Sequence, residues 1–180
     1  MDGVCGLPTG GSVPIAARAL PGDGAPSDLP PRVVATEPAV ELIRELVGRH
    51  GPVMFHQSGG CCDGSAPMCY PEGEFKVGQR DVLVGELDLG GGFPFEQDDD
   101  ETGGSSPSSS SRIRVWISGL QFDAWKHTQL VLDAVPGRGS GFSLENPTGR
   151  RFLSRARTFD EREMELLEAH PPQLGMDLDV

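Results

Sequence analysis

The residues best suited to chemistry lie in one stretch of the chain, from His56 to Tyr70. This stretch contains three of the four cysteines, Cys61, Cys62 and Cys69. Thiolates and imidazole are the ligands that zinc, cuprous copper and iron–sulfur clusters prefer. The sequence therefore predicts a metal or iron–sulfur site with Cys61, Cys62, Cys69 and His56 as its ligands.

Three glycines, Gly59, Gly60 and Gly64, lie beside these cysteines. Glycine adopts backbone conformations that other residues avoid, including positive φ. Such a backbone can turn its free N–H groups toward a bound anion or sulfide. We therefore expect the three glycines to border a bound cofactor.

The spacing of the cysteines leaves a second chemistry open. Cys61 and Cys62 are adjacent, and neighbouring side chains often point apart, which is awkward for one mononuclear metal ion. A vicinal pair can instead form a redox-active disulfide, or one thiol can act as a nucleophile. In that hypothesis Cys61 or Cys62 attacks, and His56 or His127 is the base. A third hypothesis treats the cysteines as buried and inert.

A helix and a strand must position this stretch. Thr36 is suited to be an N-cap, and Pro38 fits the first turn. Apolar residues then recur with helical spacing up to Gly51, which is suited to end the helix. These apolar residues are Ala39, Leu42, Ile43, Leu46 and Val47. The pattern predicts a helix followed by a short strand, Val53 to His56, that runs directly into the cysteines.

The remaining pattern predicts mostly strands. Strands are expected over 81–87, 113–117, 128–135 and about 151–157, with a short helix over 120–127. The order, a helix first and then mainly strands, predicts an α+β fold with a mainly antiparallel or mixed sheet or barrel.

Composition divides the chain into one domain and its flanks. Residues 1–31 are rich in Gly, Pro and Ala and predict a leader without regular structure, and residues 32–159 predict a single α+β domain. An acidic, Ser-rich segment over 90–111 predicts a flexible insertion, and residues 160–180 predict an acidic helix and tail.

Charge and hydropathy limit the partners and the compartment. Much of the net charge of −12 lies in these flanks and in the insertion, where it favours solubility. The basic and aromatic pattern expected for nucleic-acid binding is missing. The sequence contains neither an apolar run of membrane-spanning length nor a secretory signal pattern. We therefore expect a cytoplasmic protein that binds neither nucleic acid nor membrane.

Several long motifs closely resemble a bacterial family, domain-of-unknown-function family 779. They occupy residues 51–64, 67–69, 121–122, 125–130, 133, 135–139 and 141–145. The resemblance spans about residues 32–159 apart from the 90–111 insertion. Members of this family are typically encoded beside aldehyde dehydrogenases. The resemblance therefore implies an accessory role for such a dehydrogenase as partner.

A fainter resemblance concerns the A-type iron–sulfur carriers of the HesB-like fold. The opening helix, the strand into Gly-Gly-Cys and the later Gly141-Phe142 and Asn146-Pro147 pairs are similar to theirs. This implies a HesB-like architecture and an iron or cluster ligand at Cys61 or Cys62. The carriers' C-terminal cysteine pair is absent here, so that another of Cys62, Cys69 or His56 would have to replace it.

Together these patterns lead to one hypothesis and two alternatives. The first is an accessory protein, not an enzyme on its own, that binds iron, an iron–sulfur cluster or zinc and supports an aldehyde dehydrogenase. The first alternative is a small thiol enzyme acting on aldehydes or thiol adducts. The second is a structural interaction module. The sequence leaves the metal and the oligomeric state open, including a homo-oligomer.

Overall fold

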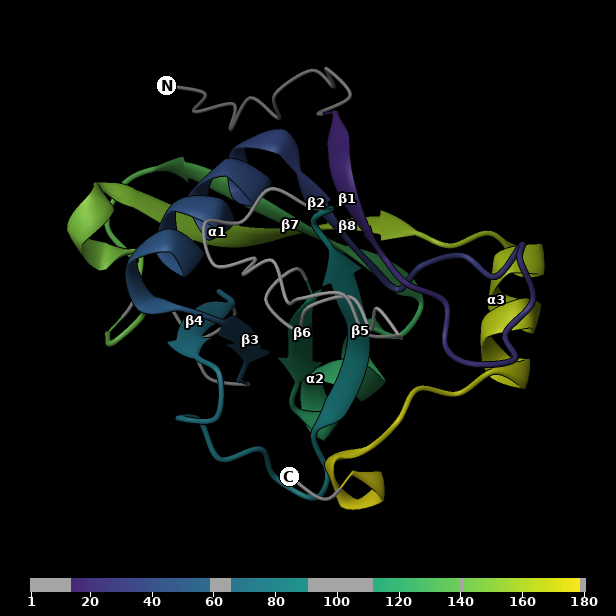
Figure 1. Cartoon of the computed structure of the whole chain (residues 1–180). Coiled ribbons are helices and arrows are strands. Elements are labelled where there is room, and N and C mark those ends of the chain that lie inside the picture. Colours follow the sequence, from purple (N-terminus) through teal and green to yellow (C-terminus); the bar gives the residue numbers. More distant parts are fainter. Residues whose placement is uncertain (1–13, 59–65, 91–111, 140, 179–180) are drawn as a thin grey trace, which may run out of the picture.

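The centre of the molecule is one mixed sheet (Figure 1). The computed structural model describes residues 14–58, 66–90, 112–139 and 141–178. Within these residues the strands run in the order β4-β3-β6-β5-β1-β2-β7-β8. Their bounds are β1 Ile15–Ala19, β2 Val33–Thr36, β3 Val53–Gln57, β4 Met68–Pro71, β5 Val82–Asp88, β6 Arg112–Ile117, β7 Thr128–Pro136 and β8 Arg150–Thr158.

Two of the strand pairs are parallel. β2 runs parallel to β7, and β3 runs parallel to β6, while the other neighbouring pairs are antiparallel. The mixed α+β class expected from the sequence is therefore confirmed. Because β3 and β6 are parallel, the chain leaves both strands at the same end of the sheet, which brings the segments that follow them together.

The helix α1 (Glu37–His50) supplies a large part of the core. Thr36 caps it, since its Oγ accepts a hydrogen bond from the Ala39 N–H, and Gly51 ends it with φ of 80°. Its apolar stripe packs against the sheet, as Figure 1 shows for the blue helix over β7. The buried residues of this stripe are Ala39, Val40, Leu42, Ile43, Leu46 and Val47.

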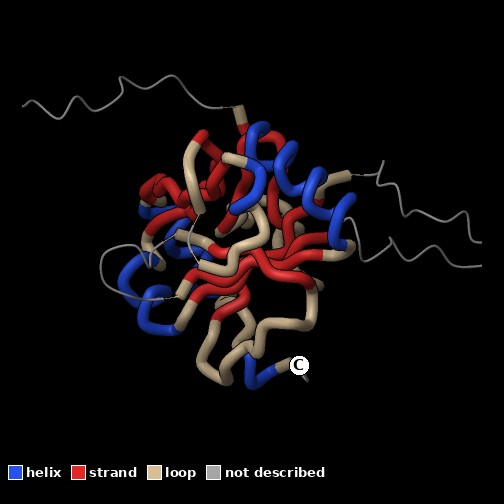
Figure 2. Tube along the Cα trace, turned by 90° about the vertical axis from the view of Figure 1, so that its left-hand side faces the viewer, coloured by secondary structure: helices blue, strands red, loops and turns tan. Residues whose placement is uncertain are grey.

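The chain path places α1 and α2 (Gly119–Trp125) at opposite ends of the sheet. α1 joins the end of β2 to the start of β3, whereas α2 joins the end of β6 to the start of β7. The acidic helix expected near the C-terminus is α3 (Glu161–Ala169), and two short 3₁₀ helices cover Asn146–Thr148 and Gly175–Asp177. Figure 2 shows these helices around the outside of the strands.

Two expectations about the N-terminal part are wrong. Residues 15–19, assigned to a leader without regular structure, form β1, which pairs with both β2 and β5 inside the sheet. The first element is therefore a strand, and the helix follows two strands. β1 is short and is flanked by glycines and prolines, so the periodicity of apolar residues does not reveal it. Most of the expected 90–111 insertion lies outside the described residues.

Thr36 connects the helix cap to a buried carboxylate, and this contact gives a test of the fold. Its hydroxyl donates to Asp133 Oδ1 at 2.6 Å, and Arg155 donates to Asp133 Oδ2 at 2.7 Å. We expect Thr36→Val to lower the free energy of unfolding by about 1–3 kcal/mol, because the cap and a buried hydrogen bond are lost together. Urea denaturation measures this, and Thr36→Ser is the matched control that keeps the hydroxyl. Equal stability of the two variants would contradict this account of the cap.

Candidate functional site

The candidate site is built on the alternation of side chains along β3. Val53 and Phe55 belong to the hydrophobic core, and Phe55 meets Phe152 edge-to-face with ring centroids 4.8 Å apart. Successive strand residues point to opposite faces of a sheet. Gln57 therefore faces the interior like Phe55, and His56 faces the other way.

His56 is held in place by three groups. Its Nε2 lies 2.9 Å from Asp81 Oδ2, and its Nδ1 lies 2.8 Å from Ser58 Oγ. The ring of Phe75 covers the imidazole, with centroids 4.3 Å apart, and His56 is only 4% exposed. The imidazole is thus fixed in orientation at the position where β3 leads into the cysteines.

The hydrogen bonds also indicate which nitrogen carries the proton. A carboxylate only accepts, so Nε2–H donates to Asp81, which itself also accepts from the Gly78 N–H at 2.7 Å. Nδ1 then presents a lone pair to the Ser58 hydroxyl. The order hydroxyl, imidazole, carboxylate is the arrangement in which histidine serves as a general base. Ser58 is exposed, so the hydroxyl end of this series lies at the surface, while the imidazole itself is buried.

Cys69 lies on the opposite face of the sheet from His56. It pairs with Phe55 in the β3–β4 register, whereas His56 pairs with Met68. Cys69 is fully buried in the hydrophobic core, and its thiol is free. Because the sheet separates them, Cys69 and His56 do not converge on one metal ion, and the predicted four-ligand set is wrong in this respect.

The surroundings of Cys69 also disfavour its thiolate. The Cys69 N–H donates to Ser143 Oγ at 2.8 Å, and the Ser143 hydroxyl donates to the carboxylate of Glu145, which is 1% exposed. Burial, and then the nearby Glu145 charge, raise the pKa of the Cys69 thiol well above its usual value. A thiol held in its neutral form is a poor nucleophile and a poor metal ligand. Cys69 is therefore a core residue.

The other predicted site residues have different outcomes. Cys61 and Cys62, with Gly59, Gly60 and Gly64, lie outside the described residues, so their roles stay predictions. His127 is exposed, and its ring stacks on that of Trp125 with centroids 6.4 Å apart. Within the described ranges, no group of three or more His, Cys, Asp and Glu side chains is placed to hold a metal ion.

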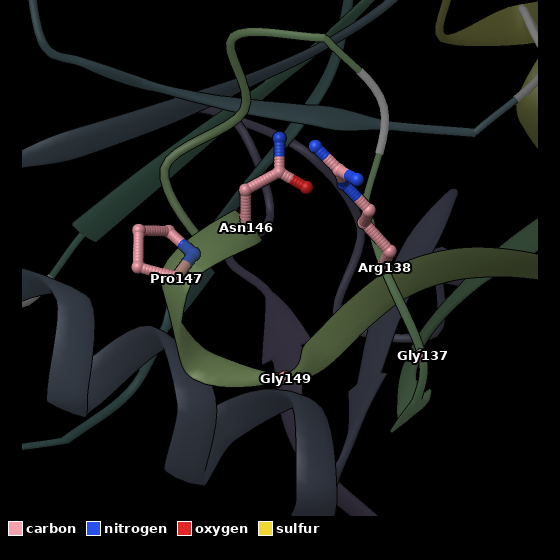
Figure 3. Close-up of a pocket in the computed structure, with 5 residues that line it drawn as sticks. All are labelled: Gly137, Arg138, Asn146, Pro147 and Gly149. Carbon is pink, nitrogen blue, oxygen red and sulfur yellow. The ribbon is translucent and has the colours of Figure 1, made fainter.

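The glycine-rich turn after β7 serves packing around Glu145. A side chain on Gly139 would place its Cβ 2.6 Å from Glu145 Oε1, so that a larger residue there would have to displace the Glu145 carboxylate. Beside it lies an open depression lined by Gly137, Arg138, Asn146, Pro147 and Gly149. Figure 3 shows the Arg138 guanidinium and the Asn146 amide on facing sides of this depression.

Sequence reasoning missed the residues that organise His56 and Cys69. Asp81 and Phe75 are far from His56 in the chain, and no local pattern connects them to it. Glu145 likewise reaches Cys69 only through the fold. One signal in the sequence was available for separating the two sites. Side chains alternate between the two faces of a strand, so His56 must point away from its neighbours on β3 that face the core.

Comparison with known proteins adds the family. Residues 42–158 match the model of a family described as a domain of unknown function, DUF779. No curated protein and no solved structure matches the chain. The HesB-like architecture and the association with an aldehyde dehydrogenase therefore stay predictions. In the described part of the chain, no helix is long and apolar enough to cross a membrane.

Burial of Cys69 predicts a selective alkylation pattern. We expect iodoacetamide at pH 8 to leave Cys69 unmodified in the native protein, because its thiol is enclosed in the core and its pKa is raised. Peptide mass spectrometry after digestion measures this, and the same reaction in urea is the control. Equal modification of Cys69 with and without urea would contradict its placement in the core.

Glu145 predicts a pH dependence of stability. Burial raises the pKa of this carboxyl above its ordinary 4.5, against the opposing effect of hydrogen bonds from Ser143 and from the N–H groups of Glu145 and Phe152. Its contribution to stability is therefore complete below pH 4.5 and is lost as the pH rises through the folded-state pKa. We expect the free energy of unfolding of the wild type, relative to Glu145→Gln, to fall over that range.

Urea denaturation at a series of pH values measures this difference. Glu165→Gln, at an exposed position of α3, is the control and is expected to show no such trend. A constant difference between the wild type and Glu145→Gln from acid to neutral pH would contradict the raised pKa.

Proposed function

Since the chain belongs to the DUF779 family, we propose that it is an accessory protein whose vicinal thiols, Cys61 and Cys62, capture an aldehyde reversibly in support of an aldehyde dehydrogenase. The observation that carries the proposal is the oriented imidazole of His56. Its Nε2 is held by Asp81, and its Nδ1 faces Ser58, three residues before Cys61. A chain of three residues spans at most about 11 Å, so the Cα of Cys61 lies within that distance of the Cα of Ser58.

The chemistry needs only the thiol, the base and the aldehyde. The thiol proton passes to His56 Nδ1, directly or through the Ser58 hydroxyl, and the thiolate sulfur forms a bond to the carbonyl carbon. The carbonyl oxygen then takes the proton from the imidazolium and becomes a hydroxyl. The product is a hemithioacetal, and the reverse steps release the aldehyde unchanged. Asp81 holds the ring so that Nδ1 faces the Ser58 hydroxyl, as a carboxylate partner of a catalytic histidine does.

The position of Cys69 supports this assignment over the four-ligand metal site. With Cys69 in the core and both ring nitrogens of His56 engaged, the loop thiols lose two of their predicted co-ligands. Binding of iron, an iron–sulfur cluster or zinc by Cys61 and Cys62 is the second candidate. It is favoured by the two soft thiols and their flanking glycines, and further ligands would come from the same segment or from a second copy of the chain.

The role of His56 is tested by the reactivity of the loop thiols. We expect His56→Gln to slow alkylation of Cys61 and Cys62 at pH 7 by about tenfold, because less thiolate forms without the base. The rate is followed against pH by peptide mass spectrometry, with circular dichroism to verify the fold. His127→Gln is the matched control, since its exposed ring stacks on Trp125, and it should leave the rate unchanged. An unchanged rate in folded His56→Gln would remove His56 as the base.

Capture of an aldehyde is tested with acetaldehyde itself. We expect millimolar acetaldehyde to protect Cys61 and Cys62 from alkylation in the wild type, and dilution to restore the reactivity. Comparing Cys61→Ser with Cys62→Ser then identifies the thiol that adds. Absence of protection at both thiols contradicts capture. Stoichiometric iron or zinc in protein purified without oxygen would favour the second candidate instead.

A further inference from the structure

A cavity of about 240 Å³ lies beneath α2, at the end of the sheet where β3 and β6 end. It is surrounded by α2, by the ends of β3 and β6 and by the start of β7. Arg32, just before β2, residues 154–156 of β8 and Val84 of β5 complete the lining. Its apolar wall includes Ile117, Phe122 and Leu130. The volume is below the roughly 300–1,000 Å³ of typical ligand pockets, so it suits a small molecule.

Gln57 contributes a buried acceptor to the cavity. The side chain lines the cavity, the residue is 4% exposed, and its Oε1 has no hydrogen-bond partner among the described residues. Buried polar atoms are nearly always paired, and an unpaired one lowers stability. The Gln57 side chain points inward because it alternates with His56 along β3. Its backbone is held by the hydrogen bond that the Ser118 N–H donates to the Gln57 carbonyl at 3.0 Å. The cavity therefore offers an acceptor to a molecule that brings a donor.

Arg32 contributes a half-buried positive charge at the same cavity. Its Nη2 donates to the Leu167 carbonyl at 2.8 Å, and its guanidinium lies over the Phe122 ring at 5.6 Å. Unlike Lys126, which lies 3.8 Å from Asp123, it has no ion pair with a carboxylate in the residues that the structure describes. Burial accordingly lowers the pKa of Arg32. A guanidinium in this setting favours an anion.

The described lining contains three cationic side chains, those of Arg32, Lys126 and Arg155, and no acidic residue. Lys126 lies 3.8 Å from Asp123 and Arg155 pairs with Asp133 at 2.7 Å, so that among the three only Arg32 has no carboxylate partner in the described residues. An ammonium group is therefore disfavoured as the donor to Gln57, and a neutral hydroxyl suits it. A phosphate would gain little from walls that are mostly apolar, whereas a carboxylate needs few polar contacts beyond one guanidinium.

We propose that this cavity binds a small hydroxycarboxylate with an apolar body. The carboxylate pairs with Arg32, the hydroxyl donates to Gln57 Oε1, and the body packs on Ile117, Phe122 and Leu130. This assignment goes beyond the proposed aldehyde capture by Cys61 and Cys62. It does not depend on that capture, because the described residues that line the cavity include no cysteine.

Titration of the full chain by NMR tests the proposal with two probes, 4-hydroxybenzoate and 6-hydroxyhexanoate. We expect at least one of them to bind saturably with a Kd of about 1 mM or tighter, with shifts at the Gln57 side-chain amide and the Phe122 ring. The methyl ester and the analogue without the hydroxyl should each bind about tenfold more weakly. Because these comparisons use the wild type, they hold even where a variant fails to fold.

Two variants assign the contacts. Gln57→Leu should abolish the preference for the hydroxyl and retain the preference for the carboxylate, whereas Arg32→Gln should do the reverse. Cys61→Ser/Cys62→Ser should bind like the wild type, which separates failure of this proposal from failure of aldehyde capture. Absence of saturable binding of both probes would overturn the proposal, and so would equal binding of acid and ester or displacement by equimolar inorganic phosphate.

Discussion

The pairing of β3 with β4 decides what each polar side chain near the cysteines can do. Phe55 opposite Cys69 and His56 opposite Met68 fix which residues face the core and which face away from it. A shift of this register by one residue would exchange the two faces, placing an imidazole in the hydrophobic core and Phe55 outside it. The core therefore holds the register in place, because Phe55 packs on Phe152 and Cys69 is enclosed. The separation of His56 from Cys69 follows from that packing.

The edge of β4 is itself secured by a distant segment. The Leu144 N–H donates to the Cys69 carbonyl at 3.1 Å, and Ser143 accepts from the Cys69 N–H. These contacts join β4 to the segment that leads into β8, the opposite edge of the sheet. The carboxylate of buried Glu145 lies in the same segment. It accepts hydrogen bonds from the Ser143 hydroxyl, from its own N–H and from the N–H of Phe152. A polar network with each member satisfied in this way stabilises a unique arrangement.

The parts of this fold that could be predicted are those with strong local patterns. The apolar stripe of α1, its Thr36 cap and the long β7 are encoded within short windows of sequence. β1 could not be found in this way, since its five residues are identified as a strand only by their pairing with β2 and β5. The candidate site shows the same division. His56 is recognisable from the sequence, but Asp81 and Phe75, which orient its ring, reach it only through tertiary structure.

Three buried side-chain oxygens have no hydrogen-bond partner in the described part of the chain: Oε1 of Gln57, Oε1 of Gln121 and Oδ1 of Asn146. Gln57 and Gln121 lie at the α2 end of the sheet, whereas Asn146 lies beyond the end of β7, at the α1 end. Between the two ends, Thr36, Asp133 and Arg155 satisfy one another. Sequences usually break the rule of paired polar groups where function requires it. The α2 end is also where β3 leads into Ser58 and the cysteines. Two of the three oxygens without a partner, those of Gln57 and Gln121, therefore lie at the same end of the sheet as the oriented imidazole of His56.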